Sequence, residues 1–360
     1  MLQIAHGKII PEYSSAYALR CRRYLDKFPE RRILSVGGLI LKDKVENFTS
    51  EYRSLIMTIM AVLKGNRSLE IFLSKGKYLR KKYLKALKST IPEFDIIIFE
   101  GPWQYPLVRD QLHGKLIVYD AHNMESALRK GNYWEKYTLE IEKQLSDRAD
   151  LIITVSEDDR IKISDIYNIS MDKIVSIPEG FELPKETWKG ISNEIVFIGS
   201  AYGPNIDAGK EVIEMAKSLP NYTFKIIGTV CNSLPRKVPG NVKLLGMIDD
   251  IRKETELCSS FLALNPVKVG SGRNLKMNDY IAHGIPVITT EIGSRGFSQE
   301  IVDNFFIADI GDFINKIREI SSLDAELHQR SKAMVDYAKN NNYEKTKTKS
   351  YDAIMKILNR

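Results

Sequence analysis

Short apolar runs rich in β-branched residues alternate with longer segments of helical periodicity along most of the chain. This alternation is typical of β-α-β units and of parallel sheets. Several runs are apolar almost throughout, as expected when helices cover both faces of a sheet. In the first half the pattern predicts strands at residues 2–6, 32–36, 69–73, 95–99, 115–119, 151–155 and 173–177.

The pattern stops at residues 182–193, where proline, glycine and no periodicity indicate an interdomain linker. It then resumes, and beyond Gly311 the chain is helical in character, with a break at residues 340–343. The strands predicted in this half are residues 194–199, 223–228, 241–246, 260–265, 286–290 and 304–308.

We therefore expect an α/β fold with two Rossmann-like, doubly wound domains. Their predicted extents are residues 1–185 and 186–340, followed by a C-terminal helix at residues 341–360 that packs back on the first domain. Ligands of such sheets bind at the carboxyl ends of the strands. We expect these ends to face a shared cleft, which predicts a ligand between the two domains.

Composition narrows the class of protein. A chain of 360 residues is long enough for two domains. Its composition, 43% hydrophobic and 28% charged residues, is typical of a globular protein. The net charge of +7 favours anionic partners such as nucleotides, lipid head groups or nucleic acid. Three scattered cysteines, no apolar run of 18 residues and no signal-like N-terminus predict a cytoplasmic chain.

One glycine-rich, basic loop joins the strand before Asn265 to a helix expected at about residues 275–283. Asn274 is a suitable N-cap for that helix, and Gly284 a suitable C′ residue before Pro286. Gly270 and Gly272 allow close approach of a ligand to the backbone. The unpaired amides of the first helical turn attract an anion.

Charged side chains extend this prediction. Arg273 and Lys276 add two positive charges at the same helix end, suited to phosphates. Asp279 lies one turn further on and can accept hydrogen bonds from a sugar diol. The combination predicts a nucleoside diphosphate site, although an ordinary loop with solvated charges would have the same composition. The loop is not a Walker loop, and no G-x-G-x-x-G follows the first strand.

The segment G-R-N-L-K-M-N-D, followed by A-H-G-I-P-V-I, resembles the donor-site signature of retaining GT-B glycosyltransferases, those of group 1 and family 4. Four further segments resemble parts of that family in the family's order. They are Y-D-A-H-N-M-E-S (119–126), V-S-E with I-P-E-G-F (155–157 and 177–181), F-I-G-S-A-Y-G-P-N-I-D-A (197–208) and L-G-M-I-D-D (245–250).

The resemblance implies a GT-B fold and transfer of a sugar from a nucleotide-diphosphate donor to a glycan or lipid-linked acceptor, with retention of configuration. It implies His122, Arg273 and Lys276 as catalytic residues. The implied donor-binding residues are Gly199, Ser200, Asn205, Met247, Ile248, Gly270, Ser271, Gly272 and Asp279. The implied acceptor-side residues are Ser14, Ser15, Arg20 and Asn123.

The chain departs from the family signature at several positions. Ser271 stands where the first glutamate of the family's pair lies, and Asp279 replaces the second. Asn274 replaces an arginine that many members have. The first-domain Gly-Gly loop is Ser14-Ser15, and the arginine and lysine after the first strand of the second domain are missing, with Lys210 a weak substitute.

The implied chemistry needs neither a metal nor a cofactor. Arg273, Lys276 and the helix N-terminus would stabilise the departing diphosphate. That phosphate would accept the acceptor's proton, and His122 would hydrogen-bond the transferred sugar. The pair Asp249-Asp250 is interpreted as a helix start near Ile251.

Residues 75–88 predict a basic amphipathic helix with seven cations and no acid. Leu79, Tyr83, Leu84 and Leu87 fall on one stripe. The stripe can pack on the sheet while the lysines face water, and the lysines can also bind an anionic membrane surface. We expect no nucleic-acid partner, because no nucleic-acid-binding motif accompanies the basic residues.

Three alternatives to a transferase stay open at this point. A subunit that binds nucleotide sugars without turnover would fit the departures from the signature. A sugar-nucleotide epimerase would convert the donor with no acceptor present. An RNA- or lipid-binding module would gain no thermal stability from nucleotides.

Overall fold

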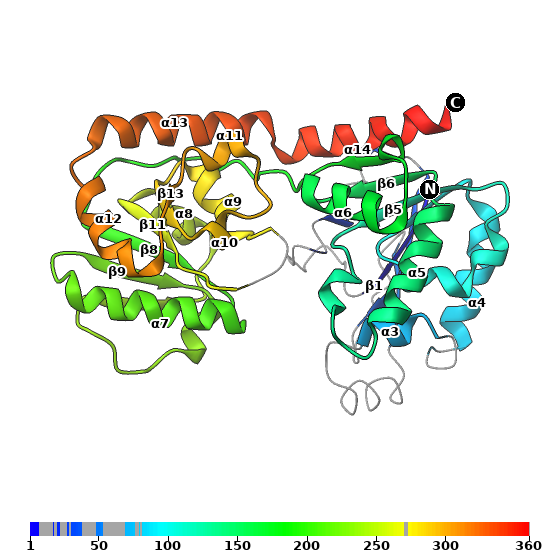
Figure 1. The fold of residues 1–360 in the computed structure, drawn as a ribbon, viewed down its shortest axis with the longest axis horizontal. Helices are drawn as coiled ribbons and strands as arrows, with labels where there is room; N and C mark the ends of the chain where they lie inside the picture. The colour runs from blue at the N-terminus through cyan, green and yellow to red at the C-terminus, as the bar shows by residue number, and fades with distance from the viewer. Residues whose placement is uncertain are drawn as a thin grey trace. The chain divides into compact units, whose positions relative to one another are not determined.

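The computed structural model divides into two compact units, one made of Met1–Glu179 and Thr346–Arg360, the other of Gly180–Lys345 (Figure 1). It describes residues 1–6, 17, 20–21, 27–28, 30–37, 48–52, 69–75, 79, 81–269 and 273–359.

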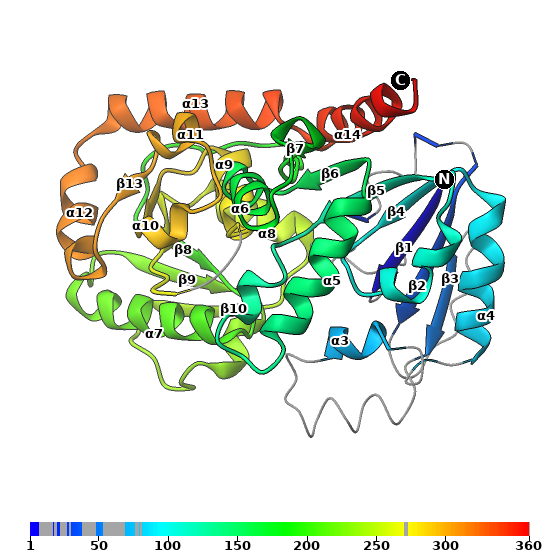
Figure 2. The same cartoon turned by 45° about the vertical axis from the view of Figure 1, so that its right-hand side comes forward.

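The first unit contains one parallel sheet with the strand order β3-β2-β1-β4-β5-β6-β7, visible in Figure 2. Its strands are β1 (Leu2–His6), β2 (Arg32–Gly37), β3 (Phe48–Tyr52), β4 (Ile96–Phe99), β5 (Leu116–Ala121), β6 (Leu151–Thr154) and β7 (Ile174–Ser176). The chain reverses its direction of winding between β1 and β4, and such a reversal is where doubly wound sheets bind ligands.

The strand residues of the first sheet bury alternate side chains on opposite faces. Ile97 and Phe99 lie in one core, whereas Ile96 and Ile98 lie in another. The helices described before the domain boundary are α3 (Leu69–Leu73), α4 (Lys81–Thr90), α5 (Glu135–Arg148) and α6 (Glu157–Tyr167). Side chains of α3 to α6 share the core with Ile97. Both faces are therefore buried, as parallel sheets require.

The second unit repeats this architecture with the strand order β10-β9-β8-β11-β12-β13, again parallel. Its strands are β8 (Glu194–Ile198), β9 (Thr223–Ile227), β10 (Val242–Gly246), β11 (Leu262–Asn265), β12 (Val287–Thr289) and β13 (Phe306–Ile307). Its winding reverses between β8 and β11. Two doubly wound α/β domains are thus confirmed.

Helices cover the second sheet on both sides (Figure 1). They are α7 (Gly203–Ser218), α8 (Asp250–Cys258), α9 (Lys276–His283), α10 (Glu291–Ser294), α11 (Gln299–Val302), α12 (Phe313–Ile320) and α13 (Asp324–Asn340). Short 3-10 turns are η3 (Ile91–Glu93), η4 (Tyr105–Leu107), η5 (Arg109–Gln111), η6 (Ala127–Arg129), η7 (Met171–Lys173), η8 (Thr229–Ser233) and η9 (Ile310–Asp312). The last helix, α14 (Tyr343–Leu358), begins at the last residue of the predicted break.

Two strand predictions in the first unit are wrong. Residues 69–73 form α3, because Ile71, Phe72 and Leu73 are all buried in succession, and a short apolar run alone does not separate a strand from a buried helix. The strand β3 was not predicted, since F-T-S-E-Y is largely polar. Its place at the edge of the sheet explains that composition.

The domain boundary lies between Glu179 and Gly180, six residues before the predicted one. The whole of the predicted linker, residues 182–193, belongs to the second unit. Trp188 in this segment is buried, and its indole N–H donates to the carbonyl of Ser260 at 3.0 Å. From Thr346 onward, α14 belongs to the first unit, and its Ile354 packs in the same core as Ile98.

Gly284 ends α9 as predicted, with φ of 69°. A Cβ here would lie 2.7 Å from Ser331 Oγ and from Val335 Cγ2. Gly284→Ala should therefore lower the free energy of unfolding by at least ~1–2 kcal/mol, the cost of left-handed backbone in an L-residue. Urea unfolding of the full chain measures it. Gly311→Ala is the matched control, because its Cβ would meet nothing within 4 Å; equal loss in both variants would contradict the assignment.

Candidate functional site

A pocket of about 380 Å³ opens at the carboxyl ends of β8 and β11, where the second sheet reverses its winding. Gly199 and Ser200 follow β8 directly, and the loop after β11 leads to Arg273. The pocket is lined by Ile198, Gly199, Ser200, Tyr202, Pro204, Asn205, Val267, Val269, Arg273, Asn274, Leu275, Lys276, Asp279, Ile292 and Arg295. Six of the residues predicted from the sequence are among them.

Lys276 is the first residue of α9, and its side chain is buried. Its ammonium donates to Asn205 Oδ1 at 2.7 Å and lies 4.5 Å from the centre of the Phe197 ring. The Asn205 amide in turn donates to Ser200 Oγ at 3.0 Å. Three predicted site residues, one each from the loop after β8, from α7 and from α9, are thus joined by hydrogen bonds.

Burial lowers the pKa of Lys276 to about 7. Within the described part of the chain, no carboxylate lies within ion-pair distance of its ammonium. A buried cation balanced only by an amide oxygen and an aromatic face is costly to the fold. Titratable groups perturbed in this way gather at binding and catalytic sites. This lysine therefore marks the pocket as a candidate anion site.

The guanidinium of Arg273 lies against two aromatic rings, 4.2 Å from the centre of Phe297 and 5.2 Å from that of Phe181. Stacking of this kind restricts the orientation of a planar guanidinium without neutralising its charge. Gly296 keeps this packing tight, because a Cβ there would lie 3.1 Å from the Cβ of Arg273. Arg273 is therefore held in place at the pocket wall.

Asp279, the predicted sugar-diol acceptor, lines the same pocket but already has a cationic neighbour. Lys253 Nζ of α8 donates to its carboxylate at 3.1 Å. Burial lowers the pKa of Lys253, but the neighbouring carboxylates, Asp279 first among them, together raise the pKa above its ordinary value. Asp279 is one turn from Lys276 on α9, as predicted.

Some predicted donor residues are not brought to this pocket. Met247 and Ile248 follow β10, which β9 separates from β8, and they do not line the pocket. Met247 is largely exposed and Ile248 packs on the core. The predictions for Gly270, Ser271 and Gly272, and those for Ser14 and Ser15, lie outside the described residues.

Asn274 is not the N-cap of α9, a position that Leu275 takes. Its amide instead donates to Asn265 Oδ1 at 3.1 Å and ties the loop to the end of β11. Asp249, in contrast, caps α8 by accepting from the amide of Arg252 at 2.8 Å, as predicted. A polar residue just before a helix can bond either the helix amides or another loop residue. Its place in the sequence does not determine which of these partners it takes.

Arg295 was missed by the sequence analysis, although it lines the pocket. Arg295 follows a strand, β12, and a short helix, α10, and so comes at the same edge of the sheet as Arg273. This position after a strand is the signal that could have identified it. Lys210, considered a weak substitute for a missing cation, is exposed, bonds Asp207 at 3.3 Å and does not line the pocket.

In the first unit, Arg20 is not an exposed acceptor-side residue. It is buried and forms an ion pair with Asp120, with Nη2 at 2.6 Å and Nε at 3.0 Å from Oδ1. It also donates to the carbonyl of Ile177 at 3.2 Å and lies 3.7 Å from Glu179. Arg20 thus connects β5 to the chain that leaves β7, which is a structural role.

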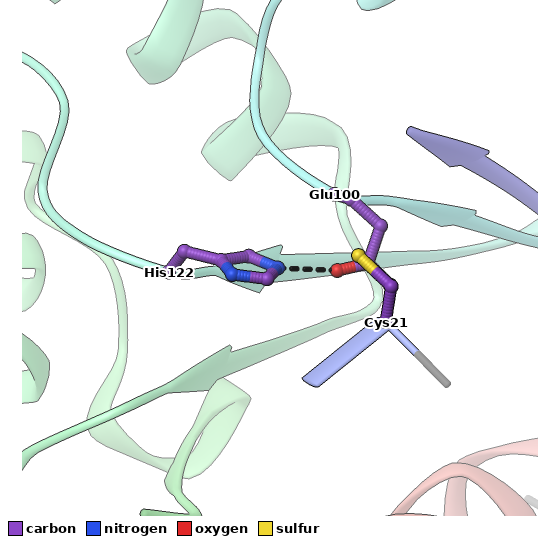
Figure 3. Close-up of side chains that lie close together, drawn as sticks. All are labelled: Cys21, Glu100 and His122. Carbon is purple, nitrogen blue, oxygen red and sulfur yellow. Dashed lines mark hydrogen bonds and ion pairs between the residues drawn. The ribbon is translucent and has the colours of Figure 1, made fainter. Parts of the chain in front are cut away.

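His122 and Asn123 follow β5 at the carboxyl edge of the first sheet and are half-buried. Figure 3 shows the imidazole Nε2 directed at the carboxylate of Glu100, to which it is bonded at 2.5 Å. Glu100 follows β4, the neighbouring strand, and is completely buried. The His122 ring also packs against Tyr17, with the ring centres 4.6 Å apart.

Cys21 lies beside this pair, and its sulfur, a carboxylate oxygen and an imidazole nitrogen are within 4.8 Å of one another (Figure 3). These are the ligand types of a transition-metal site. The residues fit such an ion poorly, because Glu100 and His122 are bonded directly and would have to separate. Burial and the Glu100 charge also raise the pKa of the Cys21 thiol well above its ordinary value, whereas a metal binds the thiolate.

The basic segment at residues 75–88 is described in part, and α4 begins at Lys81. Leu79, Tyr83 and Leu87 are buried in the core of the first unit. Lys81, Lys85 and Lys88 are exposed. The apolar stripe therefore packs on the sheet. Among the described residues, no helix is long and apolar enough to cross a membrane.

Two family models match the chain in succession. Residues 52–184 match the model described as Glycosyltransferase Family 4, and residues 192–322 match the one described as Glycosyl transferases group 1. The chain is a glycosyltransferase. Together the two matches cover well over half of this glycosyltransferase, and each falls on one of the two doubly wound units.

Solved structures place the glycosyltransferase in the GT-B fold. The Anabaena protein HepE, in complex with UDP and glucose, is 13% identical over 98% of this chain and 99% of its own, with a TM-score of 0.69. Sucrose-phosphate synthase from Thermosynechococcus elongatus is 12% identical over 99% of both chains, also at 0.69. WaaG, a glycosyltransferase of lipopolysaccharide biosynthesis, is 14% identical over 98% of this chain and 99% of its own, at 0.64. No curated protein matches the sequence.

The buried ammonium of Lys276 makes stability depend on pH. Its pKa is about 7 in the folded chain and near 10.5 when unfolded, so the unfolded chain binds more protons between these values. The penalty for burying the charge is full below pH 7 and fades as the pH rises. Lys276→Met should therefore stabilise the protein most at pH 6, and progressively less towards pH 9.

Urea unfolding of the full chain at several pH values measures this difference. Lys210→Met is the control, because Lys210 is exposed, and its effect should not vary with pH. A constant difference between Lys276→Met and the parent would contradict the burial of a charged amine.

Proposed function

We propose that this glycosyltransferase takes its sugar from a nucleoside diphosphate, and that the donor binds in the pocket lined by Arg273, Lys276 and Asp279. The observation that carries the proposal is the buried Lys276, whose ammonium has an amide oxygen as its partner at the switch point of a doubly wound sheet. A diphosphate would supply the missing negative charge. The HepE complexes with UDP and with UDP-glucose support this choice of ligand class.

The chemistry follows from where charge develops. As the bond from sugar to phosphate breaks, negative charge grows on the departing diphosphate and positive charge on the sugar ring. Cations fixed beforehand at the pocket wall stabilise that charge without rearranging, which is the most effective form of electrostatic catalysis. Arg273, stacked on Phe181 and Phe297, meets this requirement. The Asp279 carboxylate would accept hydrogen bonds from the ribose hydroxyls.

Retention of configuration, with the leaving phosphate accepting the acceptor's proton, is part of the proposal, as is contact of His122 with the transferred sugar. Both rest on the family resemblance of residues 119–126 and 272–279. We propose no metal and no cofactor for this step. The acceptor would be a glycan or a lipid-linked sugar, and the enzyme would work in the cytoplasm.

Incubation with a nucleotide sugar separates the possible activities. Transfer to an added acceptor supports a transferase, and NMR of the anomeric proton in the product then reads retention or inversion. Conversion of the donor to a second nucleotide sugar without acceptor would instead indicate an epimerase. Binding without turnover would indicate a subunit that only holds the donor.

Isothermal titration calorimetry with UDP tests the pocket directly. Lys276→Ala should weaken UDP binding by about tenfold to a hundredfold, since hydrogen bonds to charged groups contribute ~1.5–3 kcal/mol. Lys210→Ala, which removes an exposed lysine outside the pocket, should bind UDP as the parent does. Equal affinities in the parent and Lys276→Ala would show that the diphosphate binds elsewhere.

We also propose that the exposed lysines of α4 attract an anionic membrane surface. Each cation near such a surface contributes ~1 kcal/mol. Because the apolar stripe is buried in the core, this binding would be electrostatic and reversed by salt. Sedimentation with phosphatidylserine vesicles should pellet the protein at low salt and release it at high salt. Absence from the pellet at low salt would remove the proposal.

A further inference from the structure

Glu100 is an unexpected residue at the carboxyl edge of the first sheet, because it is a completely buried carboxylate. Gln3 of β1 donates its amide to one oxygen, and His122 is bonded to the other. The same Gln3 amide also donates to the carbonyl of Cys21 at 2.7 Å. One hydrogen-bonded row therefore runs across the neighbouring strands β1, β4 and β5 and ends at the imidazole.

This row fixes which nitrogen of His122 carries a proton. An ionised carboxylate can only accept, so in its hydrogen bond with Glu100 the imidazole is the donor and Nε2 carries the proton. The Gln3 amide is a donor and leaves Glu100 in the role of acceptor at both oxygens. Carboxylates that hold a histidine in this way set its tautomer and its orientation.

The other nitrogen, Nδ1, has no hydrogen-bond partner in the described part of the chain. Tyr17 packs against the ring, with the ring centres 4.6 Å apart. Glu100 holds the Nε2 edge (Figure 3), so the ring is fixed from two directions. Glu100 directly follows the last residue of β4, and His122 directly follows the last residue of β5. These parallel strands lie beside the point where the sheet reverses its winding. Substrates of such sheets bind at this edge.

We propose that Glu100 is the positioning residue of His122, keeping the proton on Nε2 and presenting Nδ1 to a hydroxyl of the transferred sugar. The proposal rests on the proposed function for its substrate, but the protonation of His122 is a property of the protein alone. Glu100 itself touches no substrate. Its effect on the reaction passes through the imidazole.

Glu100→Gln tests this with little change of volume. An amide keeps one oxygen for Gln3 and turns its NH2 towards His122, so Nε2 must become an acceptor and the proton must move to Nδ1. The rate of sugar transfer should then fall at least tenfold, while UDP affinity stays unchanged because the proposed UDP site belongs to the other unit. In a His122→Ala background, Glu100→Gln should change the rate by less than twofold.

Nitrogen-15 NMR of the full-length protein reads the tautomer, with His122→Ala assigning the signal. We expect a protonated Nε2 and a bare Nδ1 in the parent, and the reverse in Glu100→Gln. Glu142→Gln is the matched control, because Glu142 is another completely buried carboxylate of this unit, bonded to Tyr119 and Tyr167 rather than to His122. It should leave the proton of His122 on Nε2.

The parent spectrum alone decides the proposal if Glu100→Gln does not fold, since a proton on Nδ1 in the parent would overturn it. An equal fall in rate with and without His122 would also overturn it. If the parent fails to bind UDP or to transfer sugar, the proposed function fails, whereas the NMR result still decides whether Glu100 sets the tautomer.

Discussion

Parallel pairing of strands is the constraint on which both halves of this glycosyltransferase depend. In a parallel sheet every strand ends at the same edge, so the loops that follow the strands are collected there whatever their distance in sequence. The winding of the chain reverses between β1 and β4 in the first sheet and between β8 and β11 in the second. At each reversal the loops that follow the two neighbouring strands lead away in opposite directions. Glu100 and His122 gather at this edge in one sheet, as do Ser200 and Arg273 in the other.

A charged side chain is buried at the carboxyl edge of each sheet, but the two charges are compensated to different degrees. In the first, Glu100 has donors from Gln3 and His122, so its charge is compensated within the protein. In the second, among the residues that the structure describes, Lys276 has an amide oxygen and a ring face as its partners and no carboxylate. Satisfied polar networks make a site rigid, whereas an uncompensated charge makes it ready for a ligand. The first edge therefore has the character of a positioning device and the second that of a binding site.

Much of this could be predicted from the sequence, because periodicity and helix ends depend on neighbouring residues. All strands of the two sheets except β3, the C′ residue Gly284 and the position of Lys276 and Asp279 on one helix are of this kind. What failed depends on tertiary partners. Arg20 finds Asp120 a hundred residues away, and the sequence offers no signal for that pairing. Likewise residues 69–73 fold as a helix with Ile71, Phe72 and Leu73 all buried, and a short apolar run does not distinguish such a helix from a buried strand.

The ion pair between Lys253 and Asp279 gives one carboxylate of the pocket wall a partner from α8. A ribose that hydrogen-bonds to Asp279 would have to share the carboxylate with an ammonium or displace it, so entry of a nucleoside becomes an exchange of partners. In the proposed donor site, two adjacent ribose hydroxyls would compete with the Lys253 ammonium for this carboxylate better than the one hydroxyl that deoxyribose offers.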